Sequence, residues 1–298
     1  MLVKLKYLTS GESHGKGLLG IINGIPAGLG IDEEYILNQL SRRQKGHGRG
    51  KRMKVESDKA EIYSGVRLGK TIGSPIGLII ENLDYKNWAS KMPIDKSNKK
   101  IKEITLPRPG HADLAGVEKF GFSDIRNVIE RSSARETAMR VAIGSICRKL
   151  LKELGVEVGS RVIQIHDVYD DSNINFDKGA EFIASKADSS DVRCLSKDKT
   201  KNMMDRIDNA KKTGDSVGGV FEVFATGIPN GLGSYSQWFD RLQSKISESI
   251  MSINAIKGIE FGNGFENSTK KGSQVHDEIG WDGERYIRYS NNAGGIEG

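Results

Sequence analysis

Gly24-Ile-Pro-Ala-Gly-Leu-Gly30 recurs near the other end of the chain as Gly227-Ile-Pro-Asn-Gly-Leu-Gly233. Each copy follows an apolar run typical of a strand, over 18–22 and 219–225, and precedes an amphipathic stretch that predicts a helix. Six identities in seven residues, in matched surroundings, indicate a duplicated strand-turn-helix unit. Because there are two copies and no longer array, we place the repeats, around 18–45 and 219–253, inside one compact fold rather than a solenoid.

The two repeated helices carry different start signals. The first is expected to begin at Asp32, since acidic residues fill its first turn and basic residues its last, as the helix dipole favours. The second is expected to begin with Ser234-Tyr-Ser-Gln237, a capping-box pattern. Its apolar face would consist of Trp238, Phe239, Leu242, Ile246 and Ile250.

A third helix is predicted without interruption from an N-cap at Ser123 to a stop at Gly155, and a further helix near 201–212. At about 100° per residue, Arg135 would lie on the apolar side of the third helix, with Arg131 at its edge. An arginine there needs an anion, which is either a ligand or a buried carboxylate such as Glu136.

Composition is that of a globular protein of enzyme size: 298 residues, 37% hydrophobic and 28% charged. The most apolar stretch, 17–31, is interrupted by Asn23 and Pro26, so no membrane span is predicted, and the N-terminus does not resemble a secretory signal. Cys147 and Cys194 lie far apart and indicate reduced thiols in a cytoplasmic protein. No metal-ligand spacing and no nucleotide-binding glycine motif is present, so no metal site is predicted.

The most unusual charge pattern runs from Arg42 to Lys54, where seven of thirteen residues are Lys or Arg and none is acidic. Such a run can be a solvated loop, a nucleic-acid site or a clamp for a small anion. Nucleic-acid binding is the alternative function, although the segment 44–61 offers no aromatic side chain for base stacking. Further arginines in glycine- or serine-flanked segments, Arg108, Arg131 and Arg135, favour the small anion.

Two histidines stand in segments that suit proton transfer. His14 lies in Gly11-Glu-Ser-His-Gly15 and His111 in Pro107-Arg-Pro-Gly-His-Ala-Asp113, where glycine and proline fix the backbone and leave room for a ligand. Each is equally compatible with a hydrogen-bonded turn. The residues alone therefore predict an enzyme for a phosphorylated, carboxylated metabolite with two histidines available as acid or base.

Six motifs in the same order make the sequence similar to the chorismate synthase family over its whole length. They are Gly11-Glu-Ser-His-Gly15, Arg49-Gly-Lys-Arg52, Ser64-Gly-Val-Arg67, Pro107-Arg-Pro-Gly-His-Ala-Asp113, Arg131-Ser-Ser-Ala-Arg-Glu-Thr137 and Ser252-Ile-Asn-Ala-Ile-Lys-Gly258. The resemblance implies an α+β fold, a β/α/β sandwich with helices enclosed between two sheets and an internal duplication. It also implies a single domain over 1–298, a cytoplasmic homotetramer, and no nucleic-acid or membrane partner.

The activity that this resemblance implies is a lyase reaction of the shikimate pathway. 5-Enolpyruvylshikimate-3-phosphate would be converted to chorismate and phosphate by an anti 1,4-elimination that needs reduced FMN without net redox change. By the family pattern, His14 would keep the reduced flavin correctly protonated and His111 would protonate the departing phosphate, with Ser13 and Ser132 as supporting hydrogen-bonding residues. Substrate contacts would come from Arg43, Arg49, Arg52, Arg108 and Arg135.

The flavin-binding positions of the family match Arg131, Ser132, Ser133, Asn254, Ala255 and Gly298. In members that reduce their own flavin, the reductant NADPH is associated with the arginines matching Arg43 and Arg49. The sequence stops at Gly298, whereas the family continues past this glycine-rich turn. The resemblance thus implies a C-terminally truncated chain without a Lys-Pro-Ile-Pro-Thr flavin loop, one more substrate arginine and an aspartate near flavin N5.

Overall fold

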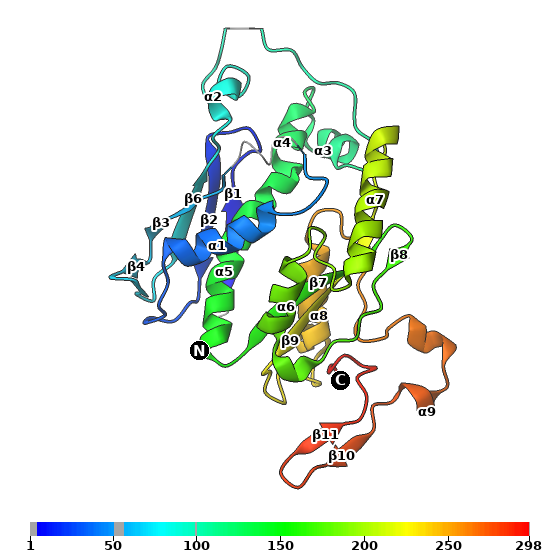
Figure 1. Cartoon of the computed structure of the whole chain (residues 1–298). Helices are drawn as coiled ribbons and strands as arrows, with labels where there is room; N and C mark the ends of the chain where they lie inside the picture. The colour runs from blue at the N-terminus through cyan, green and yellow to red at the C-terminus, as the bar shows by residue number, and fades with distance from the viewer. Residues whose placement is uncertain (1–4, 51–56, 99, 298) are drawn as a thin grey trace. The chain divides into compact units, whose positions relative to one another are not determined.

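The computed structural model describes residues 5–50, 57–98 and 100–297, which form two compact units, Met1–Ile228 and Pro229–Gly298. Helices and strands are mixed in both units. Most of the predicted site residues, including His14, His111 and Arg135, belong to the first unit. Figure 1 shows the helices and strands of the chain.

The N-terminal sheet of the first unit is antiparallel, with strand order β1-β2-β6-β3. Its strands are β1 (Lys6–Ser10), β2 (Gly17–Asn23), β3 (Ala60–Ser64) and β6 (Ile76–Glu81), and a short ribbon of β4 (Val66–Arg67) and β5 (Lys70–Thr71) lies between β3 and β6 in the sequence. Alternate residues of β2 and β6 are buried, as the period of a strand with one covered face requires. These inward residues are Leu18, Ile22, Ile76, Leu78 and Ile80.

Two helices cover that face, α1 (Glu33–Gln44) and α5 (Thr137–Glu153), which also pack against each other (Figure 1). Helix α1 begins as predicted, because the Asp32 carboxylate accepts a 2.7 Å hydrogen bond from the Tyr35 amide. The close approach of α5 to β2 needs glycine at position 20, where a Cβ would overlap the Met139 side chain. Helix α1, which leads into the basic segment, packs with α5 over this face of the sheet.

The second sheet of the first unit is antiparallel with order β8-β7-β9, from β7 (Glu157–Ile165), β8 (Val168–Tyr169) and β9 (Gly219–Thr226). Helix α6 (Ala180–Asp188) packs on β7 and β9, and α7 (Lys197–Thr213) packs on β7 and β8. The helix predicted near 201–212 is confirmed, with Ser196 as N-cap and Gly214 as left-handed C-cap.

The helix predicted without interruption from Ser123 to Gly155 is wrong. It consists of α4 (Arg126–Ser132), a 3₁₀ turn over Ala134–Glu136 and α5, and short helices α2 (Tyr85–Trp88) and α3 (Asp113–Phe120) precede it. Ser133 is extended at ψ 141°, and its Oγ accepts a hydrogen bond from the Arg135 amide. A serine hydroxyl that caps the next turn competes with helix continuation, which is why the apolar pattern missed the break.

The second unit holds α8 (Leu242–Met251), α9 (Gly272–Val275) and a hairpin of β10 (Ile279–Trp281) and β11 (Tyr286–Arg288). The predicted helix start at Ser234 is wrong, because the Ser234 hydroxyl accepts a hydrogen bond from the Ser236 amide and closes a local turn. Trp238–Asp240 forms a 3₁₀ turn and Arg241 is extended before α8 begins. Trp238 is 74% exposed, so it does not belong to an apolar helix face.

Candidate active site

The loop that carries His14 is held by a buried asparagine. Asn82, which follows β6, donates hydrogen bonds from Nδ2 to the carbonyl oxygens of Glu12 (3.1 Å), Ser13 (3.3 Å) and Gly15 (2.9 Å). On its other side, Asn82 Oδ1 accepts a 2.9 Å hydrogen bond from Arg135 Nε. One amide therefore joins the histidine loop to the arginine of the α4–α5 junction.

His14 itself is fixed on two sides. Its backbone amide donates to Glu130 Oε2 at 2.7 Å, and its ring Nδ1 lies 2.9 Å from Glu130 Oε1. The imidazole stacks on Trp88 of α2 with 3.8 Å between ring centroids and an interplanar angle of 30°. With a side chain 19% exposed, His14 is accessible to a ligand while its ring orientation is restrained.

The α4–α5 junction places Arg131, Ser132 and Ser133 beside the same loop. Arg131 donates to the carbonyl oxygens of Gly11 (3.3 Å) and Thr9 (2.9 Å), and Ser133 Oγ donates to Ser13 Oγ at 3.0 Å. Ser13 is buried, whereas Arg131 is exposed, as its predicted place at the edge of the apolar stripe requires. The break in the helix is therefore what brings these hydroxyl and guanidinium groups to the His14 loop.

Arg135 is buried and pairs with a carboxylate, although not with Glu136. Its Nη1 donates to Asp58, whose side chain is 1% exposed, and Asp58 also accepts from Arg43 Nη1 at 3.4 Å. Glu136 pairs instead with Arg140 at 3.0 Å. The expected buried ion pair thus exists, but its acid comes from a distant part of the sequence.

Arginines outnumber carboxylates in this cluster. Burial lowers the pKa of Arg43, Asp58 raises it, and the neighbouring charges of Arg135 and Arg49 lower it further. Arg49 is exposed in the loop after α1 and its Nε donates to the Lys45 carbonyl. Arg43 and Arg135 share one carboxylate, that of Asp58, and the neighbouring charge of Arg49 adds to the excess of positive charge, which a polyanionic ligand would neutralise.

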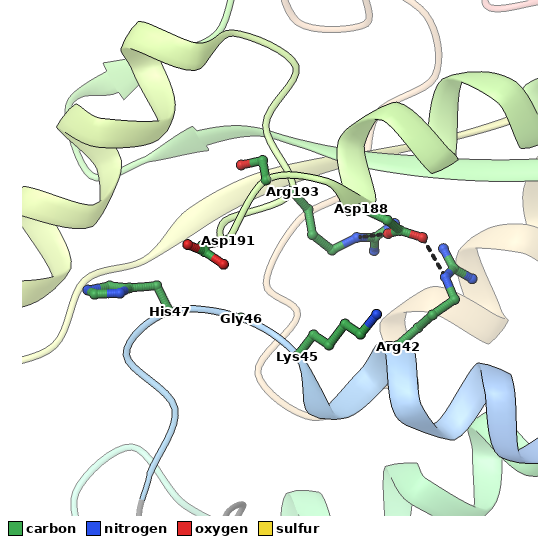
Figure 2. A pocket seen from close by; sticks show the side chains of 8 residues that line it. Arg42, Lys45, Gly46, His47, Asp188, Asp191 and Arg193 are labelled. Atoms are coloured by element: carbon green, nitrogen blue, oxygen red, sulfur yellow. Dashed lines mark hydrogen bonds and ion pairs between the residues drawn. The ribbon is translucent and has the colours of Figure 1, made fainter.

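A pocket of about 330 Å³ lies at the start of the basic segment and is lined by residues of that segment and of the stretch 188–193 (Figure 2). Asp188 accepts hydrogen bonds from Arg42 Nε (2.6 Å) and Arg193 Nε (2.7 Å), so one carboxylate bridges two guanidinium groups. The His47 amide also donates to the Asp191 carbonyl at 2.8 Å. Arg42 therefore ties the end of α1 to the loop after α6, and its neighbour Arg43 faces the Asp58 cluster.

The turn Pro107–Asp113 is held by its own residues. Arg108 is 43% exposed and makes two hydrogen bonds to the Asp113 carboxylate, at 2.8 and 2.9 Å. These bonds lower the pKa of Asp113 to about 2. His111 is exposed, with Nδ1 2.9 Å from the Pro109 carbonyl, in the turn that leads into α3.

The remaining predicted positions belong to the second unit or lie outside the described residues. Asn254 and Ala255 belong to the second unit, in the turn after α8, where Ala255 has a left-handed φ of 68°. Arg52 and Gly298 lie outside the described residues. No set of three His, Cys, Asp or Glu side chains suited to a metal occurs among residues 5–50, 57–98 and 100–297.

Sequence reasoning missed four residues that build the site: Asp58, Asn82, Trp88 and Glu130. Trp88 lies in a lysine-rich stretch that has the composition of a surface connector. Glu130 was within reach, because it directly precedes the Arg131–Thr137 motif. Its partner His14 is remote in sequence, however, and nothing in the local pattern joins the two.

Comparisons with known proteins place this site in a family. The family model described as chorismate synthase matches residues 5–298. The chain is 53% identical over 296 residues to chorismate synthase of Alkaliphilus metalliredigens, and 51% identical over 301 residues to that of Aquifex aeolicus. These alignments cover 98% and 99% of the chain, and 76% of each relative.

A solved structure is also similar, the crystal structure of a chorismate synthase, with a TM-score of 0.83 and 44% identity. The alignment covers 100% of this chain and 81% of that one. None of the described helices is long and apolar enough to cross a membrane. On the family model and on these identities, the chain belongs to the chorismate synthase family.

Proposed function

We propose that the His14 loop, the Asp58 arginine cluster and the Pro107–Asp113 turn together form the active site. The chain is a lyase of the shikimate pathway, which leads to the aromatic amino acids, and it converts 5-enolpyruvylshikimate-3-phosphate to chorismate and phosphate. The observation that carries the proposal is the position of Asn82, which bonds the His14 loop on one side and Arg135 on the other. A proton-transfer group is thereby fixed beside an excess of guanidinium groups.

Charge explains the choice of substrate. The substrate bears two carboxylates and a phosphate, and guanidinium groups bind such oxygens with planar, two-pronged geometry. Arg43 and Arg135 both pair with Asp58, Arg49 adds a neighbouring positive charge, and these three arginines supply the main part of the clamp. We assign Arg108 to the same substrate, and we assign Arg52 on the family motif.

The two histidines divide the proton transfers in this proposal. The departing phosphate needs a proton, and His111, exposed beside Arg108, is placed to give it. His14, with restrained ring orientation, keeps the reduced flavin correctly protonated. Ser13 and Ser132 support the site by hydrogen bonding.

The family uses reduced flavin, and the residues around the His14 loop fit reduced FMN. Arg131, Ser132 and Ser133 offer one guanidinium and two hydroxyl groups in a short turn beside Ser13, a donor set suited to an electron-rich ring or a phosphate. When bound, the reduced cofactor supplies that ring to a reaction with no net redox change. We assign Asn254, Ala255 and Gly298 to the same cofactor on the family motif, and Arg43 and Arg49 to NADPH as its reductant.

The φ angles of the repeated glycines support an internal duplication of the turn. We assign the two copies to a single β/α/β sandwich over 1–298 on the family resemblance. Gly24 and Gly28 of the first copy have φ of 99° and 92°, and Gly227 and Gly231 of the second have 77° and 84°. The same left-handed turns thus follow β2 and β9. The homotetramer, the cytoplasmic location and the absence of nucleic-acid and membrane partners remain predictions.

The direct test is an anaerobic assay with reduced FMN, with the Aquifex aeolicus relative as positive control. On addition of substrate we expect a flavin absorbance change and release of phosphate. The comparisons do not favour the nucleic-acid alternative. That alternative would gain support from tight, steeply salt-dependent binding of unrelated nucleic acids together with no phosphate release.

A further inference from the structure

Glu130 is a buried carboxylate on α4 to which the proposed chemistry assigns no part. Its side chain is 1% exposed, and both of its oxygens face the His14 loop. Oε2 accepts the backbone amide of His14 at 2.7 Å, and Oε1 lies 2.9 Å from ring Nδ1. The Glu130 carbonyl oxygen also accepts the Ser13 amide at 2.9 Å, so α4 and the loop are in register at this residue.

This geometry fixes where the imidazole carries its proton. An ionised carboxylate can only accept hydrogen bonds, so Nδ1 of His14 must be the donor. The other ring nitrogen, Nε2, is then the one at which a proton is gained or lost. The stack on Trp88, at 3.8 Å, opposes a ring flip that would put Cδ2 in the place of Nδ1 beside Glu130.

A second basic residue, Arg126, faces the Glu130 carboxylate. Arg126 Nη1 lies 3.4 Å from Glu130 Oε1, one helical turn away, so the carboxylate has a cation other than His14. The Arg126 guanidinium also lies 5.3 Å from the Trp88 ring centroid, and Lys91 Nζ lies 4.8 Å from it. Asp84 accepts a 2.8 Å hydrogen bond from Trp88 Nε1.

We propose that Glu130 is the positioning residue that holds His14 in the tautomer with its proton on Nδ1, so that Nε2 is the atom through which His14 takes and gives a proton. The inference rests on the proposed function of His14 as a proton carrier. It adds to that function the residue that orients the ring, Glu130, and the ring atom that exchanges the proton, Nε2. The same division of labour, in which a carboxylate orients a histidine, is effective in other enzyme classes.

Glu130→Gln tests the proposal with almost no change of shape. The His14 amide still needs an acceptor, so the new side-chain oxygen faces it and the NH₂ group faces Nδ1. Nδ1 lies 2.9 Å from the Oε1 position and 3.0 Å from the Oε2 position, so the nearer of its two neighbours becomes an NH₂ donor, which favours an accepting Nδ1 with the proton on Nε2. The variant is therefore expected to invert the tautomer rather than simply weaken one hydrogen bond. Glu153→Gln, at an exposed ion pair with Lys149 on α5, is the matched control.

The readout is the ¹⁵N spectrum of histidine-labelled protein without flavin, recorded at a pH above the ordinary pKa of histidine. A His14→Asn variant identifies which signals belong to His14. We expect a protonated Nδ1 in the unmodified chain and in Glu153→Gln, and a protonated Nε2 in Glu130→Gln. Turnover with reduced FMN should fall about 10²–10⁴-fold in Glu130→Gln, as for a catalytic histidine in the wrong tautomer.

A protonated Nε2 in the unmodified chain would overturn the proposal, and this holds even if the Glu130→Gln variant does not fold. An unchanged tautomer in a folded Glu130→Gln variant would also overturn it. Failure of the proposed function has a different signature: His14→Ala would then leave turnover intact while the tautomer result still stood.

Discussion

Gly11–Gly15 and Pro107–Asp113 each carry a histidine, yet distant residues hold the first segment and the second holds itself. Asn82, Glu130 and Ser133 bond to the His14 loop from three separate elements. Arg108 and His111 bond within their own turn, to Asp113 and Pro109, and both are exposed. Folding therefore fixes the His14 loop, one half of the proposed site, before any substrate binds. The other half, the Pro107–Asp113 turn, is held by local bonds, and its exposed side chains are available to substrate.

The largest effect on activity is expected from the local turn. His111→Ala should lower turnover by about 10²–10⁴-fold, the usual range for a positioned general acid, with an unchanged melting temperature. The side chain is exposed and bonds a carbonyl oxygen two residues away, so the fold does not depend on it. Phosphate release and thermal melts on one preparation check both halves of the statement. Unchanged turnover in a folded, flavin-bound variant would remove His111 from the mechanism.

The largest effect on stability is expected from the preorganised half. Arg135→Ala leaves the buried Asp58 with the more distant Arg43 as cation and leaves Asn82 Oδ1 without its donor. Breaking such a buried pair should lower the free energy of unfolding by about 3–5 kcal/mol. Chemical denaturation measures it, with Arg49→Ala as control because that side chain lies in an exposed loop. Equal stability of the two variants would show that Arg135 is not part of the scaffold.

Asn82→Ala tests the link between the His14 loop and the arginine cluster. The substitution removes the hydrogen bonds that Asn82 donates to three backbone carbonyls and the one that it accepts from Arg135 Nε, which should cost about 1–3 kcal/mol. Asn87→Ala is the matched control, because that amide bonds only to Asp84 at the surface within the described residues. Hydrogen exchange should be faster in the Gly11–Gly15 loop of Asn82→Ala alone. Equal exchange in both variants would contradict the role given to Asn82.

A smaller effect is expected from acid. The pKa of Asp113 is lowered to about 2, so its bond to Arg108 stabilises the fold above the ordinary aspartate pKa near 4 and is lost as the pH falls toward 2. An exposed guanidinium limits this contribution to about 1 kcal/mol, or a fall of ~2–4 °C in melting temperature. Asp113→Asn should lack this part of the acid dependence. The same acid slope in both proteins would mean that the pair contributes nothing.

Local signals predicted local structure well. Asp32 as N-cap of α1 and the helix that became α7 followed from their own residues, because caps and amphipathic periodicity act within a few positions. The same kind of signal gave a wrong helix prediction at Ser133 and at Ser234. Their hydroxyl groups accept a hydrogen bond from the amide two residues later and close a turn, so no helix continues or begins there.

The candidate site divides in the same way. Its histidines and arginines could be named from motifs, and the burial of Arg135 followed from helical periodicity. Asp58 and Asn82 could not be named, and Glu130, although it adjoins the Arg131–Thr137 motif, could not be given a role, because each bonds to a partner far away in the sequence. No residue pattern around a lone acid or amide reports such a partner before the fold is known.

The central claim, that Arg43, Arg135 and the neighbouring Arg49 bind the substrate, is tested most directly by calorimetric titration of 5-enolpyruvylshikimate-3-phosphate into Arg49→Ala. We expect the substrate to bind about 1.5–3 kcal/mol more weakly than to the unmodified chain, as for a lost charged hydrogen bond, with an unchanged melting temperature. Arg67→Ala, which removes an exposed arginine from β4, should bind as the unmodified chain does. Equal affinity in all three proteins, with and without reduced FMN, would contradict the claim.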